Sequence, residues 1–315
     1  MNKILVTGGA GFIGSALAEK LISNPDNYVV IVDNLSTGNL GKLPNLPKTN
    51  WRFIKCDVNY YTDIAPVMTA YQFDYVFHFA AVVGVLRTQQ NPVSVLNDID
   101  GIKNVLSLSK NTTVKRVFFS SSSEIYGDPV EMPQNVYTTP LNSRLPYAVV
   151  KNIGEAFLRS YKQEFDLDYT IFRFFNTYGP KQSRDFVISK FMLAAMNNRD
   201  ITIYGDGLQT RTFCYIDDNI DTCLTAFYGN KVVNGVINIG GNREVTIQEL
   251  AEIIVRETGS KSKIVHIDPL KEGDMRRRQP DNSDMKQLLG RPLIKVDEGI
   301  RKILEKGLFE LENAK

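Results

Sequence analysis

Tyr147 and Lys151 are the two residues of this chain whose types and spacing most directly indicate chemistry. Of the 14 tyrosines, only Tyr147 is followed four residues later by lysine, just after Pro146 at the start of an expected helix. This spacing puts both side chains on one helix face, where the ammonium stabilises a phenolate. Tyr147 is therefore expected to act as a general base near neutral pH, although a free tyrosine titrates near ~10. An isolated tyrosine and lysine pair at this spacing more often lies on a solvated helix face. The residues around the pair therefore decide whether a catalytic role is the better interpretation.

A run of four serines supplies a third member of this group. Ser120 to Ser123 follow an apolar segment, 116–120, that has the pattern of a strand. Active sites of open α/β sheets lie at the carboxyl ends of their strands. One of these hydroxyls is expected to hydrogen-bond the oxygen of a reacting alcohol while Tyr147 takes its proton. A serine run by itself is also common loop material.

The N-terminal glycines indicate a dinucleotide. An apolar strand, 3–7, runs into Gly8, Gly11 and Gly14 and then into an expected helix over 15–22. Gly8 gives a tight turn, Gly11 lets backbone N–H groups approach a pyrophosphate, and Gly14 lets the helix lie close to the sheet. A second apolar strand, 28–32, ends in Asp33, whose carboxylate is suited to an adenosine ribose and would repel a 2′-phosphate. The cofactor predicted is NAD rather than NADP.

Strand-like and helix-like segments alternate through the first part of the chain. Strands are expected at 4–6, 29–32, 51–55, 75–79, 116–120 and 169–174, with helices at 63–70, 93–109 and 146–164. This alternation predicts an α/β fold with a doubly wound parallel Rossmann sheet in an NAD-binding domain over 1–180. A smaller C-terminal α/β substrate lobe is expected over 181–315, from a helix at 186–197, strands at 201–204 and 236–239 and a helix at 246–258. Part of 211–238 is expected to return to the first domain.

Composition excludes several other classes of function. The 315 residues are 43% hydrophobic and carry a net charge of +2, with no basic run that favours nucleic acid. No apolar run approaches the ~20 residues of a membrane span, and the glycines interrupt any signal-like region. Three cysteines without a C-x-x-C pair favour a reducing cytoplasm. The two histidines are too far apart in sequence to predict a metal site.

These motifs together resemble the extended short-chain dehydrogenase/reductases that modify nucleotide sugars, a group of 4-epimerases, dehydratases and uronate decarboxylases. The resemblance covers nearly the whole chain. Its carriers are the glycine motif 7–14, Asp33 to Leu35, Asp57-Val58, His78 to Ala81, the serines ending in Tyr126-Gly127, Tyr147 with Lys151, Arg173 to Pro180, Gly205 to Gly207 with Arg211, and Gly273 to Arg276.

The resemblance implies roles for individual residues. It implies that Asp57 and Val58 flank the adenine, that Ala80 and Ala81 line the cofactor, and that Asn97 supports the cofactor's far half. The implied NAD site comprises Gly8, Gly11, Phe12, Ile13, Gly14, Asp33, Asn34, Asp57, Val58, Phe79, Ala80, Ala81, Asn97, Tyr147 and Lys151. The implied catalytic set comprises Tyr147, Lys151, Ser122, Ser123 and Glu124, with Ser122 as partner of the substrate hydroxyl. The implied substrate contacts are Asn176, Arg211 and Arg276, with Arg87 as a further candidate.

The resemblance further implies a homodimer formed through the helices at 93–109 and 146–164, and a UDP-, GDP-, dTDP- or CDP-linked sugar as substrate. These enzymes begin by oxidising the sugar at C4, and their reactions diverge at the 4-keto intermediate. Dehydration typically uses an acidic pair, whereas Ser123-Glu124 holds only one carboxylate. A 4-epimerase needs no additional acid or base and is the prediction.

Three other outcomes stay open at this point. Decarboxylation of UDP-glucuronate is the first, because Ser123-Glu124 and the segments 123–129 and 209–217 are similar to that branch. Against it, the loop 181–185 is shorter than that of the decarboxylases, and Arg184 and Arg87 are only candidates for the arginine that would bind the substrate carboxylate. The second is C4 oxidation with release of the keto sugar. The third is a noncatalytic NAD-binding protein on the same fold, which the intact Tyr147 and Lys151 disfavour.

Overall fold

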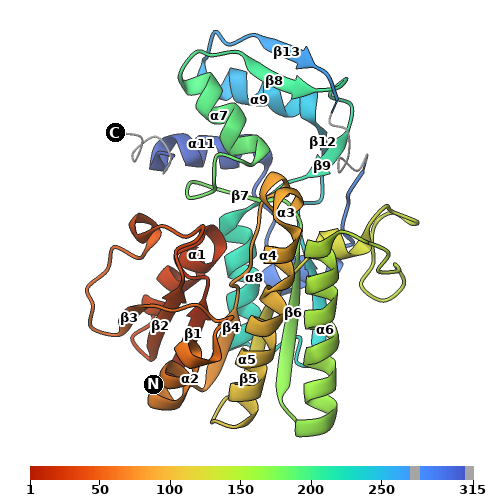
Figure 1. The fold of residues 1–315 in the computed structure, drawn as a ribbon. Helices are drawn as coiled ribbons and strands as arrows, with labels where there is room; N and C mark the ends of the chain where they lie inside the picture. The colour runs from red at the N-terminus through yellow and green to blue at the C-terminus, as the bar shows by residue number, and fades with distance from the viewer. Residues whose placement is uncertain (270–276, 309–315) are drawn as a thin grey trace. The chain divides into compact units, whose positions relative to one another are not determined.

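A seven-stranded sheet forms the centre of the fold. The computed structural model describes residues 1–269 and 277–308. The sheet has the strand order β11-β6-β5-β4-β1-β2-β3, and the pairs β1/β2, β2/β3, β1/β4 and β4/β5 are parallel. Its strands are β1 (Asn2–Thr7), β2 (Asn27–Asp33), β3 (Trp51–Lys55), β4 (Tyr75–His78), β5 (Arg116–Ser122), β6 (Asp168–Phe174) and β11 (Gly235–Ile239). The predicted Rossmann α/β fold is confirmed (Figure 1).

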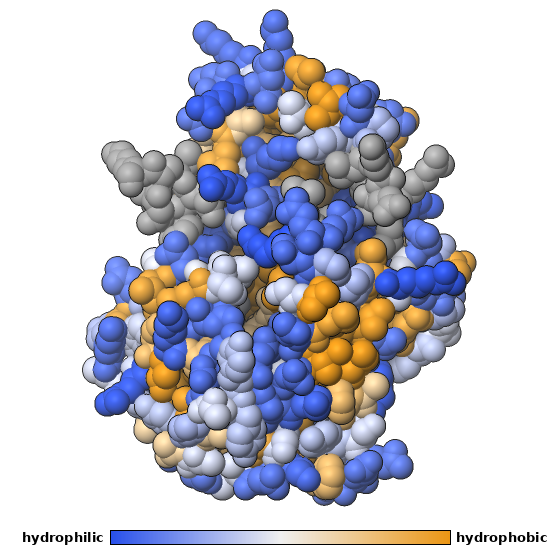
Figure 2. All heavy atoms as spheres, in the orientation of Figure 1, coloured by the Kyte–Doolittle hydropathy of each residue, from blue (hydrophilic) through white to orange (hydrophobic). Residues whose placement is uncertain are grey.

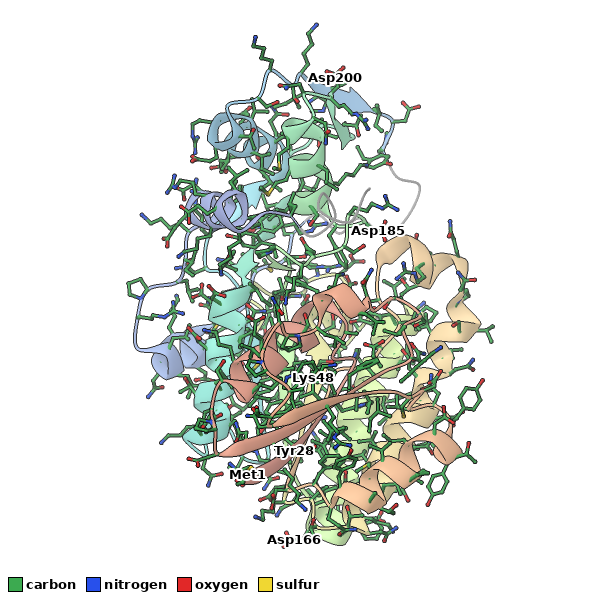
Figure 3. The ribbon with its side chains drawn as sticks, turned by 90° about the vertical axis from the view of Figure 1, so that its left-hand side faces the viewer. Met1, Tyr28, Lys48, Asp166, Asp185 and Asp200 are labelled. Atoms are coloured by element: carbon green, nitrogen blue, oxygen red, sulfur yellow. The ribbon has the colours of Figure 1, made fainter. Side chains whose placement is uncertain are left out.

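The strand order places the site for a ligand. β1 lies between β2 and β4, so the chain order reverses there, and ligands of such sheets bind beyond the carboxyl ends of the strands at this point. Met1 and Tyr28, at the amino ends of β1 and β2, lie at the same edge as Asp166, which follows the last residue of α6 (Pro146–Phe165) (Figure 3). The first turns of α6, with Tyr147 and Lys151, therefore lie at the carboxyl edge of the sheet.

Helices cover both faces of the sheet because its strands are apolar on both sides. α2 (Tyr61–Tyr71), α5 (Asp98–Lys110) and α6 bury Ile64, Val105 and Leu158 against one face. On the other face, Phe227 of α8 (Ile216–Tyr228) contacts the rings of Phe77 and Phe118. α1 (Phe12–Ile22) packs on β1 and β2. No helix of the described residues is long and apolar enough to cross a membrane.

The chain forms two compact units. The first, which we call unit 1, comprises 1–127, 141–173 and 223–237, and the second, unit 2, comprises 128–140, 174–222 and 238–315. We predicted a domain over 1–180, whereas 128–140 and 174–180 group here with the C-terminal part. The strand expected at 236–239 is β11, which belongs to the central sheet.

Unit 2 contains pairs of short strands and several helices. The strands pair as β10/β7, β12/β9 and β13/β8. Thr246 caps α9, since its Oγ1 accepts the backbone N–H of Glu249 at 3.0 Å. The elements are β7 (Thr177–Tyr178), α7 (Val187–Met196), β8 (Ile201–Tyr204), β9 (Thr210–Thr212), β10 (Cys214–Tyr215), β12 (Glu244–Thr246), α9 (Ile247–Thr258), β13 (Ile264–Ile267), α10 (Ser283–Leu289) and α11 (Val296–Lys306).

The helix predicted over 93–109 is wrong in one respect, because it is broken at Asn97. α4 (Pro92–Leu96) ends there and α5 begins at Asp98. The break follows the short helix α3 (Val85–Gln90), and Asn97 at the break has φ −63° and ψ −22°. The remaining short elements of unit 1 are the 3-10 helices η1 (Leu40–Lys42) and η2 (Ser123–Tyr126).

Candidate active site

The turn between β1 and α1 requires its glycines. Gly8 has φ +68°, and a Cβ there would lie 2.7 Å from the backbone N of Ala80. A Cβ at Gly14 would lie 2.3 Å from the carbonyl oxygen of Gly8, so this glycine lets α1 approach the turn. Gly11 is the N-cap residue of α1, which has no side-chain cap, and Phe12 and Ile13 open the helix half-buried. A narrow turn followed by an uncapped helix N-terminus fits the pyrophosphate of a dinucleotide.

The carboxylates after β2 and β3 form the next part of the site. Asp33 accepts the backbone N–H groups of Ala10 at 3.0 Å and Leu35 at 2.8 Å. Burial raises the pKa of Asp33, and these two hydrogen bonds oppose the rise. Asn34 donates to Asp57 Oδ2 at 2.9 Å, which joins the ends of the two strands. Val58, next to Asp57, is buried in the core.

Thr7 joins the ends of β1 and β4. Its Oγ1 accepts the N–H groups of Phe79 and Ala80, both at 3.1 Å, and lies 2.9 Å from Nδ1 of His78. Since both lone pairs of the hydroxyl are used, its proton is directed to His78, which is then neutral. Burial lowers the pKa of His78 to about 3, and Lys151 adds to this. Ala81 follows half-buried.

The serine run and α6 pair residue by residue. Ser120 Oγ accepts Lys151 Nζ at 3.3 Å, and Ser121 donates to Glu155 Oε1 at 2.7 Å. A hydrogen bond also joins the Ser122 and Tyr147 side chains. These contacts between the serines and the side chains four residues apart on α6 hold Tyr147 and Lys151 at the end of β5. Ser123 is buried and Glu124 half-buried where η2 begins.

Burial dominates the proton affinities of the Tyr147 and Lys151 pair. It lowers the pKa of Lys151 to about 8, although the negative charge of Asp98 opposes this. Burial also raises the pKa of Tyr147 well above its ordinary value, with Glu124 and Asp98 adding to the rise and the Ser122 bond reducing it. Loss of water around the phenolate thus favours the protonated phenol in this structure, and the role of Tyr147 as a general base stays a prediction.

A buried ion pair supports the serine run from behind, and sequence reasoning did not find it. Arg173 donates to both oxygens of Glu155, at 2.8 and 2.7 Å, and to the Tyr126 hydroxyl at 2.8 Å. The Glu155 side chain is 0% exposed and that of Arg173 is 2% exposed. Glu155 lies eight residues after Tyr147, and that helical repeat was the available signal.

Asn97 and Asp98 lie where α4 ends and α5 begins. Asn97 is exposed there, and its expected contact with the cofactor stays a prediction. Asp98 is buried instead and accepts the backbone N–H of Val82 at 2.7 Å.

The expected substrate residues lie in different parts of the chain. In unit 2, Asn176 donates to the carbonyl oxygen of Thr212 at 3.0 Å, which brings it next to the buried Arg211. Arg87, in unit 1, donates to the carbonyl oxygen of Val83 at 3.1 Å. Arg276 lies outside the described residues. Arg278, which sequence reasoning missed, is a buried cation two residues further on.

Fold and site together define an oxidoreductase-type enzyme with a Rossmann sheet and a tyrosine and lysine pair at its carboxyl edge. The sequence model of the NAD dependent epimerase/dehydratase family matches residues 4–240. The chain belongs to this family, and it is an NAD-dependent enzyme that modifies nucleotide sugars.

Its relatives catalyse more than one reaction. UDP-glucuronic acid decarboxylase 3 of Arabidopsis thaliana is 35% identical over 311 residues, which cover 95% of this chain and 86% of that protein. A putative UDP-glucose 4-epimerase of Methanocaldococcus jannaschii is 34% identical over 96% of this chain and 97% of its own length. The crystal structure of UDP-glucose 4-epimerase from Thermotoga maritima with UDP-glucose matches with a TM-score of 0.90 and 32% identity, over 96% of this chain and 97% of that one.

Proposed function

We propose that this protein is an NAD-dependent nucleotide-sugar 4-epimerase. The observation that carries the proposal is the arrangement of Ser122, Tyr147 and Lys151, with Glu124 as the one acidic side chain of the 120–127 segment. Epimerisation at C4 needs one group to take and return a proton, and this arrangement provides it without a second acid. Similarity to the archaeal and Thermotoga 4-epimerases supports the same reaction.

In the proposed reaction, Tyr147 accepts the proton of the C4 hydroxyl while Ser122 hydrogen-bonds the same oxygen. Lys151 stabilises the phenolate by its charge, which offsets part of the burial cost. The glycine turn and Asp33 would hold NAD, which would supply a positively charged ring able to accept and return the C4 hydride. After the 4-keto sugar has rotated in the site and presents its other face, Tyr147 returns the proton to the C4 oxygen. Asn176, Arg211 and Arg276 would bind the diphosphate, and guanidinium groups suit that charge.

The test is to incubate the purified protein with UDP-, GDP-, dTDP- and CDP-linked hexoses and uronates and to analyse the products by chromatography and mass spectrometry. A 4-epimerase gives a product of unchanged mass with a new retention time. Loss of two hydrogens would instead mean net oxidation at C4. No product from any sugar, with NAD bound, would favour a noncatalytic NAD-binding protein.

UDP-glucuronate decarboxylation is the second candidate function. The Arabidopsis decarboxylase supports it, as does Glu124 beside Ser123 at the end of the serine run. A ketone at C4 makes the C6 carboxylate a β-keto acid, which loses carbon dioxide readily. Arg87 is the candidate partner for that carboxylate in unit 1. A product lighter than UDP-glucuronate by carbon dioxide would identify this reaction.

We also propose a homodimer in the cytoplasm. Apolar side chains gather over α4 and α6 on the face shown in Figure 2, and Val93 and Leu96 of α4 are exposed. A second copy covering this face would bury them. Cys56, Cys214 and Cys223 are free thiols, which suits a reducing compartment. Sedimentation of the protein and of its Val93→Lys variant tests the dimer, which the charge should dissociate.

A further inference from the structure

A short ribbon of two antiparallel strands in unit 2, β9 with β12, carries the buried Arg211 (Figure 1). Val245 lies opposite Arg211, and Glu244 lies opposite Thr212. Each strand has only three residues, and a pair of strands by itself is marginally stable. Contacts outside the ribbon must therefore fix the place of Arg211.

Glu244 makes a contact that ties the ribbon to a distant segment, 277–281. Arg277 donates to both carboxylate oxygens, from Nε to Oε1 at 3.1 Å and from Nη2 to Oε2 at 2.8 Å. Thr210, the residue before Arg211, donates its hydroxyl to Glu244 Oε1 at 2.8 Å. Two parallel hydrogen bonds fix a guanidinium relative to a carboxylate in direction as well as in distance. We call Thr210, Glu244 and Arg277 the brace.

The segment 277–281 is itself anchored in unit 2. Gln134 donates its backbone N–H to the carbonyl oxygen of Gln279 at 2.7 Å, and its own carbonyl oxygen accepts the N–H of Asp281 at 2.8 Å. Gln134 is buried, so these hydrogen bonds are shielded from water. The brace therefore joins β9 to backbone that is held in place.

Stability alone does not account for the brace. The side chains of Arg277 and Glu244 are 54% and 24% exposed, and ion pairs at such exposure contribute little to the free energy of unfolding. Attraction of an anion does not account for it either. A negative charge close to Arg211 would repel a diphosphate, and Arg277 compensates that charge. What the brace adds is a fixed geometry.

We propose that Glu244 is a positioning residue for Arg211, and that the brace holds β9 where the Arg211 guanidinium can bind the diphosphate of the substrate. The inference rests on the proposed function, in which Arg211 contacts that diphosphate. Side chains alternate along a strand, so Arg211 faces away from Glu244 and the brace acts through the backbone of β9. Glu244 therefore affects binding of the nucleotide and not proton transfer by Tyr147.

The experiment measures binding of nucleoside diphosphates by calorimetric titration with NAD present. The native protein is titrated with UDP, GDP, dTDP and CDP, and the diphosphate that binds most tightly is used for the variants. Glu244→Gln removes the charge and one acceptor oxygen of the brace, whereas Arg277→Lys keeps the charge and loses the paired geometry. We expect each variant to bind the diphosphate about tenfold more weakly. The matched control is Glu249→Gln, which breaks an exposed pair with Arg243 and should bind as the native protein does.

The direction of the change separates positioning from other roles. Glu244→Gln leaves Arg277 with an uncompensated positive charge, so a purely electrostatic role predicts tighter binding, and that result would overturn the proposal. An unchanged affinity, with or without a lower urea midpoint, would mean a surface ion pair only and would also overturn it. An unfolded Glu244→Gln variant, or a native protein that binds none of the four diphosphates, would contradict it as well.

Turnover gives a second, separate readout. With a sugar that the native protein converts, KM should rise about tenfold in Glu244→Gln while kcat stays within about twofold, because the chemical step is untouched. A lower kcat with unchanged KM would refute the positioning role. Weaker diphosphate binding in Glu244→Gln, with no epimerised product from any sugar in the native protein, would reject the epimerase proposal alone.

Discussion

Lys151 is charged at a position where burial opposes the charge. Its pKa of about 8 means that the ammonium is lost as pH rises through about 8, and with it the stabilisation of the Tyr147 phenolate. We therefore expect kcat/KM to fall on the alkaline side near that pH. An arginine keeps its proton throughout this range, so Lys151→Arg, where it retains activity, should lack this limb. A native profile that stays flat through pH 9 would contradict the role of Lys151.

Tyr147 is expected to be indispensable for turnover. Tyr147→Phe removes the hydroxyl that takes the proton, and loss of a general base costs about 10²–10⁴-fold in rate. NAD binding should persist, because the glycine turn and Asp33 are untouched. Tyr161→Phe, on the same helix and half-buried, is the matched control and should keep native turnover. Rates and NAD affinities of the three proteins settle this, and undiminished turnover in Tyr147→Phe would refute the mechanism.

Asp33 sets the choice of cofactor by its charge. Its oxygens already accept two backbone N–H groups, so the carboxylate is fixed in place at the end of β2. A 2′-phosphate at the adenosine ribose would meet this charge, and NAD should bind at least about tenfold more tightly than NADP. Calorimetric titration with both cofactors measures the ratio of the NAD affinity to the NADP affinity. Asp33→Asn should lower this ratio. Equal affinities in the native protein would reject this reading.

At the scale of elements, the buried pair of Glu155 and Arg173 joins α6 to β6. Removing one partner of a buried pair leaves an uncompensated charge, so Glu155→Gln should lower the free energy of unfolding by about 3–5 kcal/mol. Glu164→Gln, an exposed residue of the same helix, should change it by less than about 0.5 kcal/mol. Urea unfolding of both variants measures the difference. Equal effects would mean that the pair adds nothing.

The same pair gives stability a pH dependence. Although burial opposes it, the hydrogen bonds from Arg173 hold the pKa of Glu155 below its ordinary value. Between the folded and the unfolded pKa of Glu155, the folded state therefore binds fewer protons than the unfolded chain. The stabilisation is present above the unfolded pKa and is lost as pH falls through the folded one. Urea midpoints measured from pH 7 downward should thus fall less steeply in Glu155→Gln than in the native protein.

Local patterns in the sequence predicted some of these elements well and others poorly. Tyr147 with Lys151, and Gly8 with Gly14, lie within one or two turns of chain, so spacing alone fixed their geometry. Glu155 and Arg173 are 18 residues apart on different elements, and only the packing of α6 against β6 brings them together.

Two further features depend on tertiary structure rather than on sequence periodicity. Asp98 is buried at the first residue of α5, and the continuous helical repeat expected over 93–109 concealed the break at Asn97. β11 pairs with β6 across more than 60 residues of chain, so no short-range pattern could place it in the sheet. The domain boundary that we predicted at 180 likewise took no account of contacts between distant parts of the chain.

At the scale of the whole molecule, the chain passes repeatedly between the two units. Their boundaries fall after 127, 140, 173, 222 and 237, so no single cut separates them. A fragment over 1–180 would lack β11 and would expose the edge of β6. We expect this fragment to aggregate, whereas the full chain stays monodisperse in light scattering. A stable, NAD-binding fragment would show that β11 is dispensable for the sheet.

That topology has a consequence during synthesis on the ribosome. β6 is complete once residue 174 has emerged, but its partner β11 ends only at residue 239. The β6 edge of the nascent sheet therefore stays unpaired while the intervening residues are translated. At ~5–20 residues per second this takes several seconds. During this interval the growing polypeptide is a natural client for a chaperone.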